Sequence, residues 1–392
     1  MSMNIVRDKS LPRIDYDHVM SLTKASAHAW TEKDAILYAL GIGMGADPLD
    51  ETELRFVYED SLKVFPTFPV VVGFHGGALE DIGIDYRYVL HGEHAVTLHR
   101  PFPASGRASA ASRISGAWDK GAAKGAIFSQ EKILTLDGDT QPLATLQTTS
   151  FARAEGGFGG PRDGQPSPHR PPSRSPDHIL RIATTPGQAL LYRQSGDLNP
   201  LHADPGTARA AGYERPILHG LCSFAICCRA VMATYCNFDP SRIQHHQVRF
   251  SAPVYPGETL AIALWKDGKT VSFEARVESR GITAIRNGLT LLTEHVLRST
   301  RAVERSSRGL YDNADPPLRS KRVHIDLRPF RHDLKIAAGE AQRVQMMTAK
   351  HIRDVILGTV RNEPARHFAN TLIVIQESHI SNHSRADGSR PF

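Results

Sequence analysis

The most regular alternation of apolar and polar residues in the chain covers residues 270–278. In this segment Val271, Phe273, Ala275 and Val277 alternate with polar side chains. A period of two is typical of a strand with one face in the core and the other in water. Further strands are predicted where apolar runs are bounded by turn residues, at 94–102, 112–118, 126–136, 143–152, 247–255, 258–265 and 282–293.

Other segments have the pattern of helices. Residues 217–235 are apolar on nearly all sides, which is typical of a helix buried around most of its circumference. A shorter helix is predicted over residues 31–42, because Thr31 and Asp34 have the spacing of an N-terminal capping box. The run at residues 68–73 fits either a buried strand or the start of a buried helix, since periodicity does not distinguish these in so short a segment.

These elements are divided by a segment rich in glycine and proline at residues 153–178, which is predicted to be a linker. On either side of it, a polar loop and a helix precede a set of antiparallel strands. A nearly all-apolar helix needs cover on every side, and a curved sheet wrapped around it provides that cover. The predicted fold class is therefore α+β, with one such unit at residues 1–152 and a second at residues 179–296. Residues 297–392 form a tail that is assigned to neither unit.

Composition places the chain among globular proteins, with 41% hydrophobic and 22% charged residues. The net charge of +6 comes from the tail, where residues 297–392 hold 17 Lys and Arg against 10 Asp and Glu. This tail has no aromatic interleaving and no nucleic-acid motif, so nucleic-acid binding is not expected. No apolar run approaches the roughly 18 residues that span a bilayer, so no membrane association is expected either.

All four cysteines lie in one apolar stretch between Cys222 and Cys236. This spacing favours buried, unliganded thiols over disulfides or a metal site, because the ligand pairs typical of metal centres are missing. We therefore expect no metal and a reducing, cytoplasmic environment.

Candidate chemistry is concentrated in the loop before the apolar helix. Asp197 and His202 are close in sequence and could converge on one water molecule, removing a proton from it and returning one, as general acid-base catalysts do. Asn199 lies between them and could orient either group. Gly220, near the start of the predicted helix, offers a backbone N–H to a carbonyl that becomes an oxyanion.

The same loop also has a purely structural interpretation. Asp and Asn next to proline are common turn formers, and physical reasoning alone leaves Asp197 and Asn199 open between the two roles. Asp204 is interpreted as a helix cap and His219 as a hydrogen-bonded core histidine. Ser195 has no feature of a nucleophile, since the chain contains no GxSxG motif.

The stretch YRQSGDLNPLHADP, followed by GYERPILHGLC, closely resembles the hydratase 2 motif of the MaoC-like (R)-specific 2-enoyl-CoA hydratases. That family includes the hydratase unit of peroxisomal multifunctional enzymes. The resemblance implies a tandem hot-dog fold, in which each half wraps a long helix in an antiparallel sheet. It further implies that Asp197 and His202 activate water, that Asn199 supports them, and that the Gly220 N–H polarises a thioester carbonyl.

The reaction implied by the resemblance is the reversible hydration of a trans-2-enoyl-CoA to a (3R)-3-hydroxyacyl-CoA in fatty-acid metabolism, without a metal or redox cofactor. In such proteins the N-terminal half lacks the catalytic motif and houses the acyl chain, and a homodimer is expected by analogy. His94, Cys227 and Cys228 differ from the residues common in relatives. A eukaryotic member is expected in peroxisomes, although the C-terminal RPF is not a signal of the SKL type.

Two other functions are compatible with a hot-dog fold. A non-catalytic acyl-CoA-binding or scaffold protein needs no acid-base pair, and a hot-dog thioesterase would hydrolyse the thioester instead of hydrating the double bond. The complete set of Asp197, Asn199 and His202 favours hydration over both.

Overall fold

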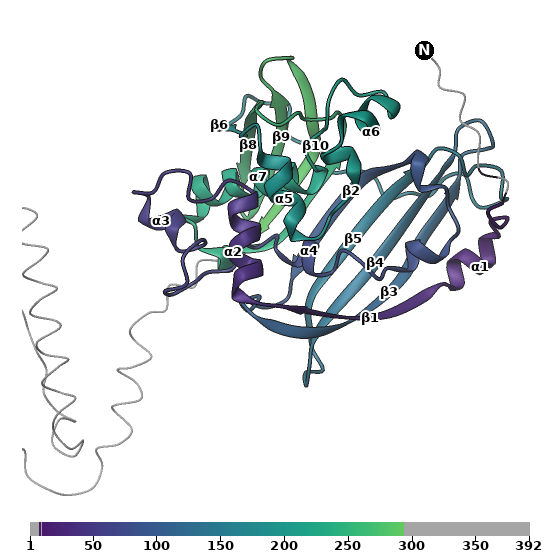
Figure 1. Ribbon diagram of the computed structural model, residues 1–392, viewed down its shortest axis with the longest axis horizontal. Helices are drawn as coiled ribbons and strands as arrows, with labels where there is room; N and C mark the ends of the chain where they lie inside the picture. Colours follow the sequence, from purple (N-terminus) through teal and green to yellow (C-terminus); the bar gives the residue numbers. More distant parts are fainter. Residues whose placement is uncertain (1–7, 9, 294–392) are drawn as a thin grey trace, which may run out of the picture. The chain divides into compact units, whose positions relative to one another are not determined.

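The computed structural model describes Asp8 and residues 10–293 of the 392-residue chain (Figure 1). The basic tail expected at residues 297–392 lies outside the described residues. The strands that the structure describes belong to a single 10-stranded sheet with the order β1-β3-β4-β5-β2-β7-β10-β9-β8-β6. Among the described residues, no helix combines the length and the apolar character that crossing a membrane requires.

Each half of the chain contributes five neighbouring strands of this antiparallel sheet. The N-terminal half supplies β1 (Thr23–Trp30), β2 (Val89–Leu98), β3 (Gly106–Asp119), β4 (Ala126–Leu136) and β5 (Pro142–Ala152). The C-terminal half supplies β6 (His178–Ala183), β7 (Ile243–Phe250), β8 (Thr259–Asp267), β9 (Thr270–Val277) and β10 (Ile282–Leu292). The halves join where β2 pairs with β7, from Glu93 opposite Arg249 to Thr97 opposite His245.

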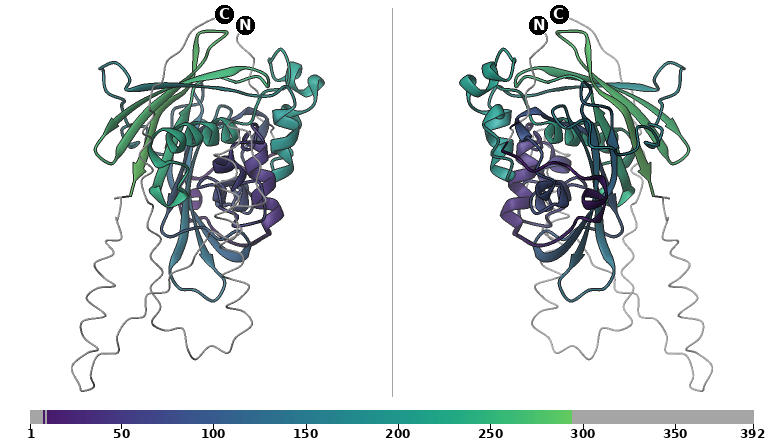
Figure 2. Two further views of the ribbon diagram at one scale, coloured as in Figure 1. Left: turned by 90° about the vertical axis from the view of Figure 1, so that its left-hand side faces the viewer. Right: turned by 90° about the vertical axis from the view of Figure 1, so that its right-hand side faces the viewer.

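The long helix of the C-terminal half is α7 (Gly220–Val231), which continues as a π-helical turn at Met232–Cys236. Every residue of α7 except Gly220 and Arg229 is buried. The helix contacts all five strands of its own half, and Figure 2 shows these strands curving around it. The apolar segment at 217–235 is therefore the buried helix that its composition predicts.

The N-terminal half departs from the expected architecture, because its sheet does not wrap a long helix. Its central segment forms α4 (Pro69–Val72), which has only 4 residues and packs against β1 and β5. Pro69 occupies the first turn, where a missing N–H costs nothing. Gly73 ends the helix, and a Cβ at this position would lie 2.6 Å from the Leu146 side chain, which would have to shift. The tandem hot-dog class is confirmed, while a long helix in each half is wrong for this half.

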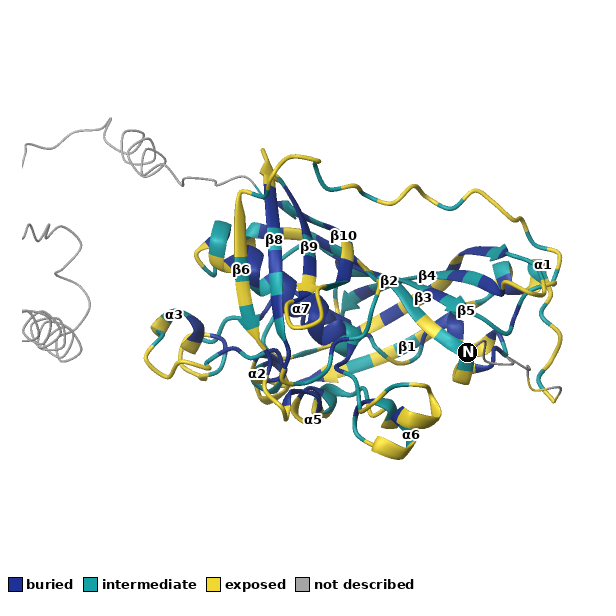
Figure 3. Cartoon of the chain, turned by 90° about the horizontal axis from the view of Figure 1, so that it is seen from above, coloured by how far each residue is buried: buried dark blue, intermediate teal, exposed yellow. Residues whose placement is uncertain are grey.

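The remaining helices lie mainly on one side of the sheet. They are α1 (Tyr16–Ser21), α2 (Glu32–Gly41), α3 (Glu51–Leu54), α5 (Gln188–Tyr192) and α6 (Pro205–Ala210). The predicted capping box of α2 is present, with Thr31 and Asp34 exchanging side-chain and backbone hydrogen bonds. Figure 3 shows α2, α5 and α6 on the same side of the sheet.

Residues 153–177 contain neither helix nor strand, and they follow the opposite side of the sheet from α5 and α6 (Figure 3). The Asp119 carboxylate accepts the N–H groups of Gly157 and Gly159, both at 2.8 Å. Farther along, the backbone carbonyl of His169 accepts a hydrogen bond from the Asn287 side chain. The connection between the halves is thus fixed to the sheet at both ends.

Candidate active site

The loop that is predicted to be catalytic, defined as residues 193–204 and called the catalytic loop below, begins with a sharp change of direction. A 3₁₀ turn at Arg193–Ser195 ends at Gly196, whose φ of 122° strongly favours glycine. A second 3₁₀ turn, Pro200–His202, starts at Asn199, and the Asn199 Oδ1 accepts the Leu201 N–H at 3.0 Å. Asn199 thereby stabilises the turn that carries His202, and Asp204 caps α6 as predicted.

Asp197 and His202 converge, as their spacing allows, and His219 joins them. Each of these residues offers a polar side-chain atom, and the three atoms lie within 4.8 Å of one another. His202 is 8% exposed, and its Nδ1–H donates to the Ile217 carbonyl at 2.8 Å. A carbonyl only accepts hydrogen bonds, so this contact leaves Nε2 with a free lone pair when the ring is neutral.

The electrostatics of the cluster keep both imidazoles neutral near pH 7. Burial lowers the pKa of His202 below its usual 6.5, although the Ile217 carbonyl and the charge of Asp197 oppose this shift. Burial, together with the neighbouring His202, lowers the pKa of His219 to about 3. A neutral His202 beside a carboxylate is a proton acceptor, which is the state that deprotonation of water requires.

The sequence favours a core role for His219, and the structure places it inside the cluster. Its ring stacks on His202 with a centroid separation of 3.7 Å. Its Nε2–H donates to the backbone carbonyl of Asp197 at 3.1 Å. His219 therefore orients the His202 ring and the Asp197 backbone together. In the sequence, the one feature that could have indicated this role of His219 is its position next to Gly220.

The same three residues have the chemical types of a metal site, but their geometry is unfavourable for one. The rings of His202 and His219 are inclined by only 26°. Lone pairs of imidazole nitrogens lie in the ring plane, so those of two stacked rings lie in separate, nearly parallel planes and do not converge well on one ion. Without rotation of one ring, this cluster does not favour a metal bound by both histidines.

Gly220 is the first residue of α7, and His219 is its N-cap. The first N–H groups of a helix have no intrahelical acceptor and carry partial positive charge. A Cβ at Gly220 would lie 3.1 Å from the Phe250 ring, so a larger residue would push this ring or the helix start. The helix therefore presents backbone donors next to the Asp197, His202 and His219 cluster.

The N-terminal half also contacts α5 and the catalytic loop that follows it, which the sequence does not indicate. The Gln188 side chain donates to the Gly41 carbonyl at 2.6 Å, and the rings of Tyr38 and Tyr192 lie 5.9 Å apart. His75 donates from Nε2 to the Gly196 carbonyl at 3.2 Å. These contacts join segments more than a hundred residues apart, and local patterns carry no information about such pairs.

One sheet built from two five-stranded halves, a buried helix and a cluster of acid-base side chains at the N-terminus of this helix are the features of a hot-dog protein of the hydratase and dehydratase type. Comparison with known families makes this assignment specific. Residues 28–154 match the MFE-2 hydratase 2 N-terminal domain, and residues 168–287 match the MaoC like domain. The chain belongs to the MaoC-like hydratase 2 family.

Individual relatives support the same assignment. The chain is 38% identical over 275 residues to the enoyl-CoA hydratase ChsH3 of Mycobacterium tuberculosis, covering 67% of this chain and 93% of that one. It is 37% identical over 283 residues to the peroxisomal enoyl-CoA hydratase 2 of Arabidopsis thaliana, covering 66% and 89%. A crystal structure of a MaoC-like dehydratase from Phytophthora capsici aligns with a TM-score of 0.63 at 31% identity, covering 71% and 98%.

Proposed function

We propose that this protein is a lyase that reversibly hydrates trans-2-enoyl-CoA thioesters to (3R)-3-hydroxyacyl-CoA in fatty-acid metabolism. The observation that carries the proposal is the convergence of Asp197, His202 and His219 beside the N-terminus of α7. Hydration needs a group that takes a proton from water and donors that stabilise an enolate-like oxygen. This site offers both within one small region.

In the proposed mechanism, Asp197 and His202 hold one water molecule. The water oxygen forms a bond to C3 of the substrate while one of its protons passes to this pair. The π electrons of the double bond move toward the carbonyl, whose oxygen accepts the Gly220 N–H. The pair then delivers a proton to C2, which completes the addition of one water across the double bond. Each step uses groups of the chain itself, so we propose that no metal or redox cofactor takes part.

The acyl-CoA thioester is the proposed substrate, and the N-terminal half is proposed to house the acyl chain. A homodimer and a cytoplasmic location, or a peroxisomal one in a eukaryote, are part of the same proposal. The four cysteines are buried and free, which is compatible with a reducing compartment. Burial also raises the pKa values of these thiols, so they are poor nucleophiles at neutral pH.

The test is to follow the enoyl absorbance of crotonyl-CoA and of a longer trans-2-enoyl-CoA during incubation with the full chain. We expect the absorbance to fall, and chiral analysis to give the (3R) product. Parallel measurement of free thiol distinguishes hydration from thioester hydrolysis. Release of CoA without a hydroxy product would identify a thioesterase, and tight binding without turnover would identify a non-catalytic acyl-CoA-binding protein.

The pH dependence of hydration tests the assignment of His202 as base. Because burial holds the pKa of His202 below 6.5, the neutral form persists as the pH falls from 7 to 6.5. We expect the acidic limb of kcat/KM for hydration to be centred below pH 6.5, where the His202 ring becomes protonated. Circular dichroism at each pH verifies folding. An acidic limb centred above pH 6.5 would contradict the assignment.

A further inference from the structure

Lys132 is a buried lysine in the half of the chain that lacks the catalytic motif. It is 1% exposed and lies on β4. Its Nζ donates to two backbone carbonyls, those of Gly73 at 2.7 Å and His75 at 2.5 Å. Burial lowers its pKa to about 8. Burying a lysine amine costs free energy unless its N–H groups find acceptors. Both acceptors of Lys132 belong to residues 73–75, so this is the segment that the side chain holds in place.

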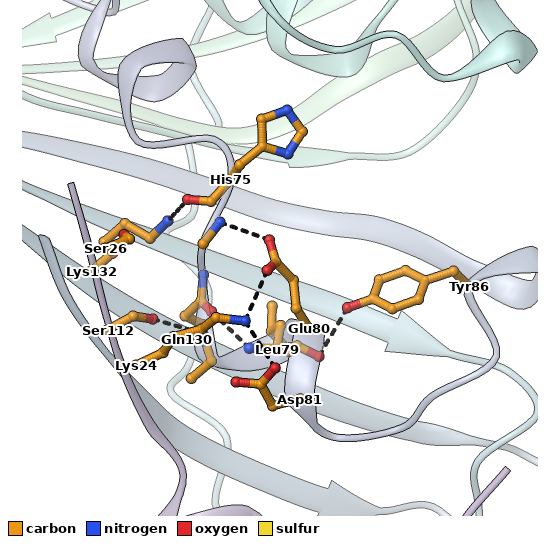
Figure 4. A network of polar contacts seen from close by, with 12 residues as sticks. Lys24, Ser26, His75, Leu79, Glu80, Asp81, Tyr86, Ser112, Gln130 and Lys132 are labelled. Carbon is orange, nitrogen blue, oxygen red and sulfur yellow. Dashed lines mark hydrogen bonds and ion pairs between the residues drawn. The ribbon is translucent and has the colours of Figure 1, made fainter. Parts of the chain in front are cut away.

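The segment held by Lys132, residues 73–80, is fixed to the inner face of the N-terminal sheet (Figure 4). Gln130, also on β4, accepts the Leu79 N–H at 2.9 Å, and Ser112 on β3 accepts the Ala78 N–H at 3.0 Å. A Cβ at Gly77 would lie 2.4 Å from the Gln130 side chain, so a larger residue there would displace the amide group that binds Leu79. The segment therefore has little freedom to move.

One side chain of this segment points away from its own sheet and contacts the catalytic loop. The His75 Nε2–H donates to the Gly196 carbonyl at 3.2 Å, and Lys132 binds the backbone carbonyl of the same His75. Gly196 directly precedes Asp197 and has the unusual φ of 122°. An unbroken series of hydrogen bonds thus runs from β4 to the residue before the proposed catalytic carboxylate.

We propose that Lys132 and His75 are positioning residues that hold Asp197 in its catalytic geometry, an inference that rests on the proposed hydration. Lys132 fixes the backbone of His75, and the His75 ring fixes Gly196. The N-terminal half then contributes to turnover as well as to the acyl site. Neither residue contacts the reacting atoms, so their effect is on the orientation of the loop, to which reaction rates are sensitive.

The first test is Lys132→Met, which keeps most of the side-chain length and removes the two hydrogen bonds. We expect kcat to fall by about tenfold, the factor that corresponds to one net hydrogen bond, with KM changed by less than about twofold. The matched control is Lys24→Met, which breaks ion pairs to Glu80 and Asp81 at the other end of the same segment. The control should retain kcat within about twofold, because exposed ion pairs contribute little.

The second test uses His75, which is exposed, so that its variants are expected to fold even if Lys132→Met does not. His75→Phe should lower kcat to a similar extent, and His75→Gln, which keeps a side-chain donor, should restore much of it. In the double variant Lys132→Met/His75→Phe, kcat should lie within about twofold of the kcat of the slower single variant. Both changes break the same series of contacts, so their effects should not add. The proposal is overturned if the two single effects on kcat multiply in the double variant, or if the folded single variants keep the kcat of the wild type.

Amide hydrogen exchange separates this proposal from the proposed function. Lys132→Met and His75→Phe should each accelerate exchange in residues 193–199, and Lys24→Met should not. If the wild-type chain hydrates no enoyl-CoA, the proposed function fails and the exchange data still decide whether the loop is held from β4. If the wild type is active while exchange and kcat are unchanged in both variants, only the positioning role fails.

Discussion

Replacing Asp197 with asparagine or His202 with glutamine is expected to lower kcat for enoyl-CoA hydration by at least about a hundredfold, the range for positioned acid-base groups. Asparagine in place of Asp197 keeps the size of the side chain and loses the carboxylate. Glutamine in place of His202 removes the imidazole Nε2 lone pair that the Ile217 contact leaves free. Steady-state kinetics with crotonyl-CoA and a longer substrate measure both effects.

The control for this pair is Asp204→Asn in the same loop. Asp204 accepts the Gly206 and Thr207 N–H groups at the start of α6, and asparagine is a comparable N-cap. We expect its kcat to stay within about twofold of wild type. Near-normal turnover in folded Asp197→Asn or His202→Gln would refute the assigned role, whereas an equal loss in Asp204→Asn would indicate general damage to the loop.

The parts of the fold that could be predicted are those with a strong local signal. The alternation at 270–278 and the apolar segment at 217–235 correspond to β9 and α7. Two strands without such a signal, β1 and β6, are absent from the prediction. Both lie at the edges of the sheet and are largely exposed along one side. Edge strands bury few side chains, so their sequences show little hydrophobic alternation.

Two predicted strands end earlier than expected: the one predicted at 94–102 is β2, which ends at Leu98, and the second ends early because an apolar residue beyond it has another role. The strand predicted at 247–255 is β7, which ends at Phe250. Val254 is buried beyond the strand, and its carbonyl accepts the Leu218 N–H at 2.7 Å. An apolar residue that anchors a loop next to the site is indistinguishable in sequence from one that continues a strand.

The candidate site also contains residues that local sequence could predict and residues that it could not. Asp197 and His202 occupy one short loop, so their convergence could be anticipated from spacing and turn chemistry. His219 stacks on His202 at the entry to α7, which a hydrogen bond from the Leu218 N–H to the distant Val254 carbonyl helps to fix. His75 contacts the other half of the chain and Lys132 holds His75, and in both contacts the partner atom is a backbone carbonyl that sequence does not distinguish. Their contribution follows from tertiary structure alone.

The largest expected effect on stability comes from an ion pair between the two halves. Arg229 on α7 donates from Nε and Nη2 to the Glu53 carboxylate at 2.9 and 2.6 Å, and Glu53 also accepts the Gly45 N–H. Both side chains are largely buried, with exposures of 15% and 7%. Glu53→Ala leaves the Arg229 charge in the interior without its carboxylate, which typically costs about 3–5 kcal/mol.

Urea unfolding of Glu53→Ala should therefore show a lower midpoint with an unchanged m-value. The matched control is Glu278→Ala, since its pair with Arg181 is similarly short at 2.6 Å but the two side chains are 45% and 63% exposed. Water replaces a lost partner at such a site, so the control should unfold close to wild type. Equal losses in the two variants would show that burial does not set the strength of the Glu53 pair. A loss confined to Glu53→Ala would show that α7, which carries Gly220 at its other end, is held in place by the N-terminal half.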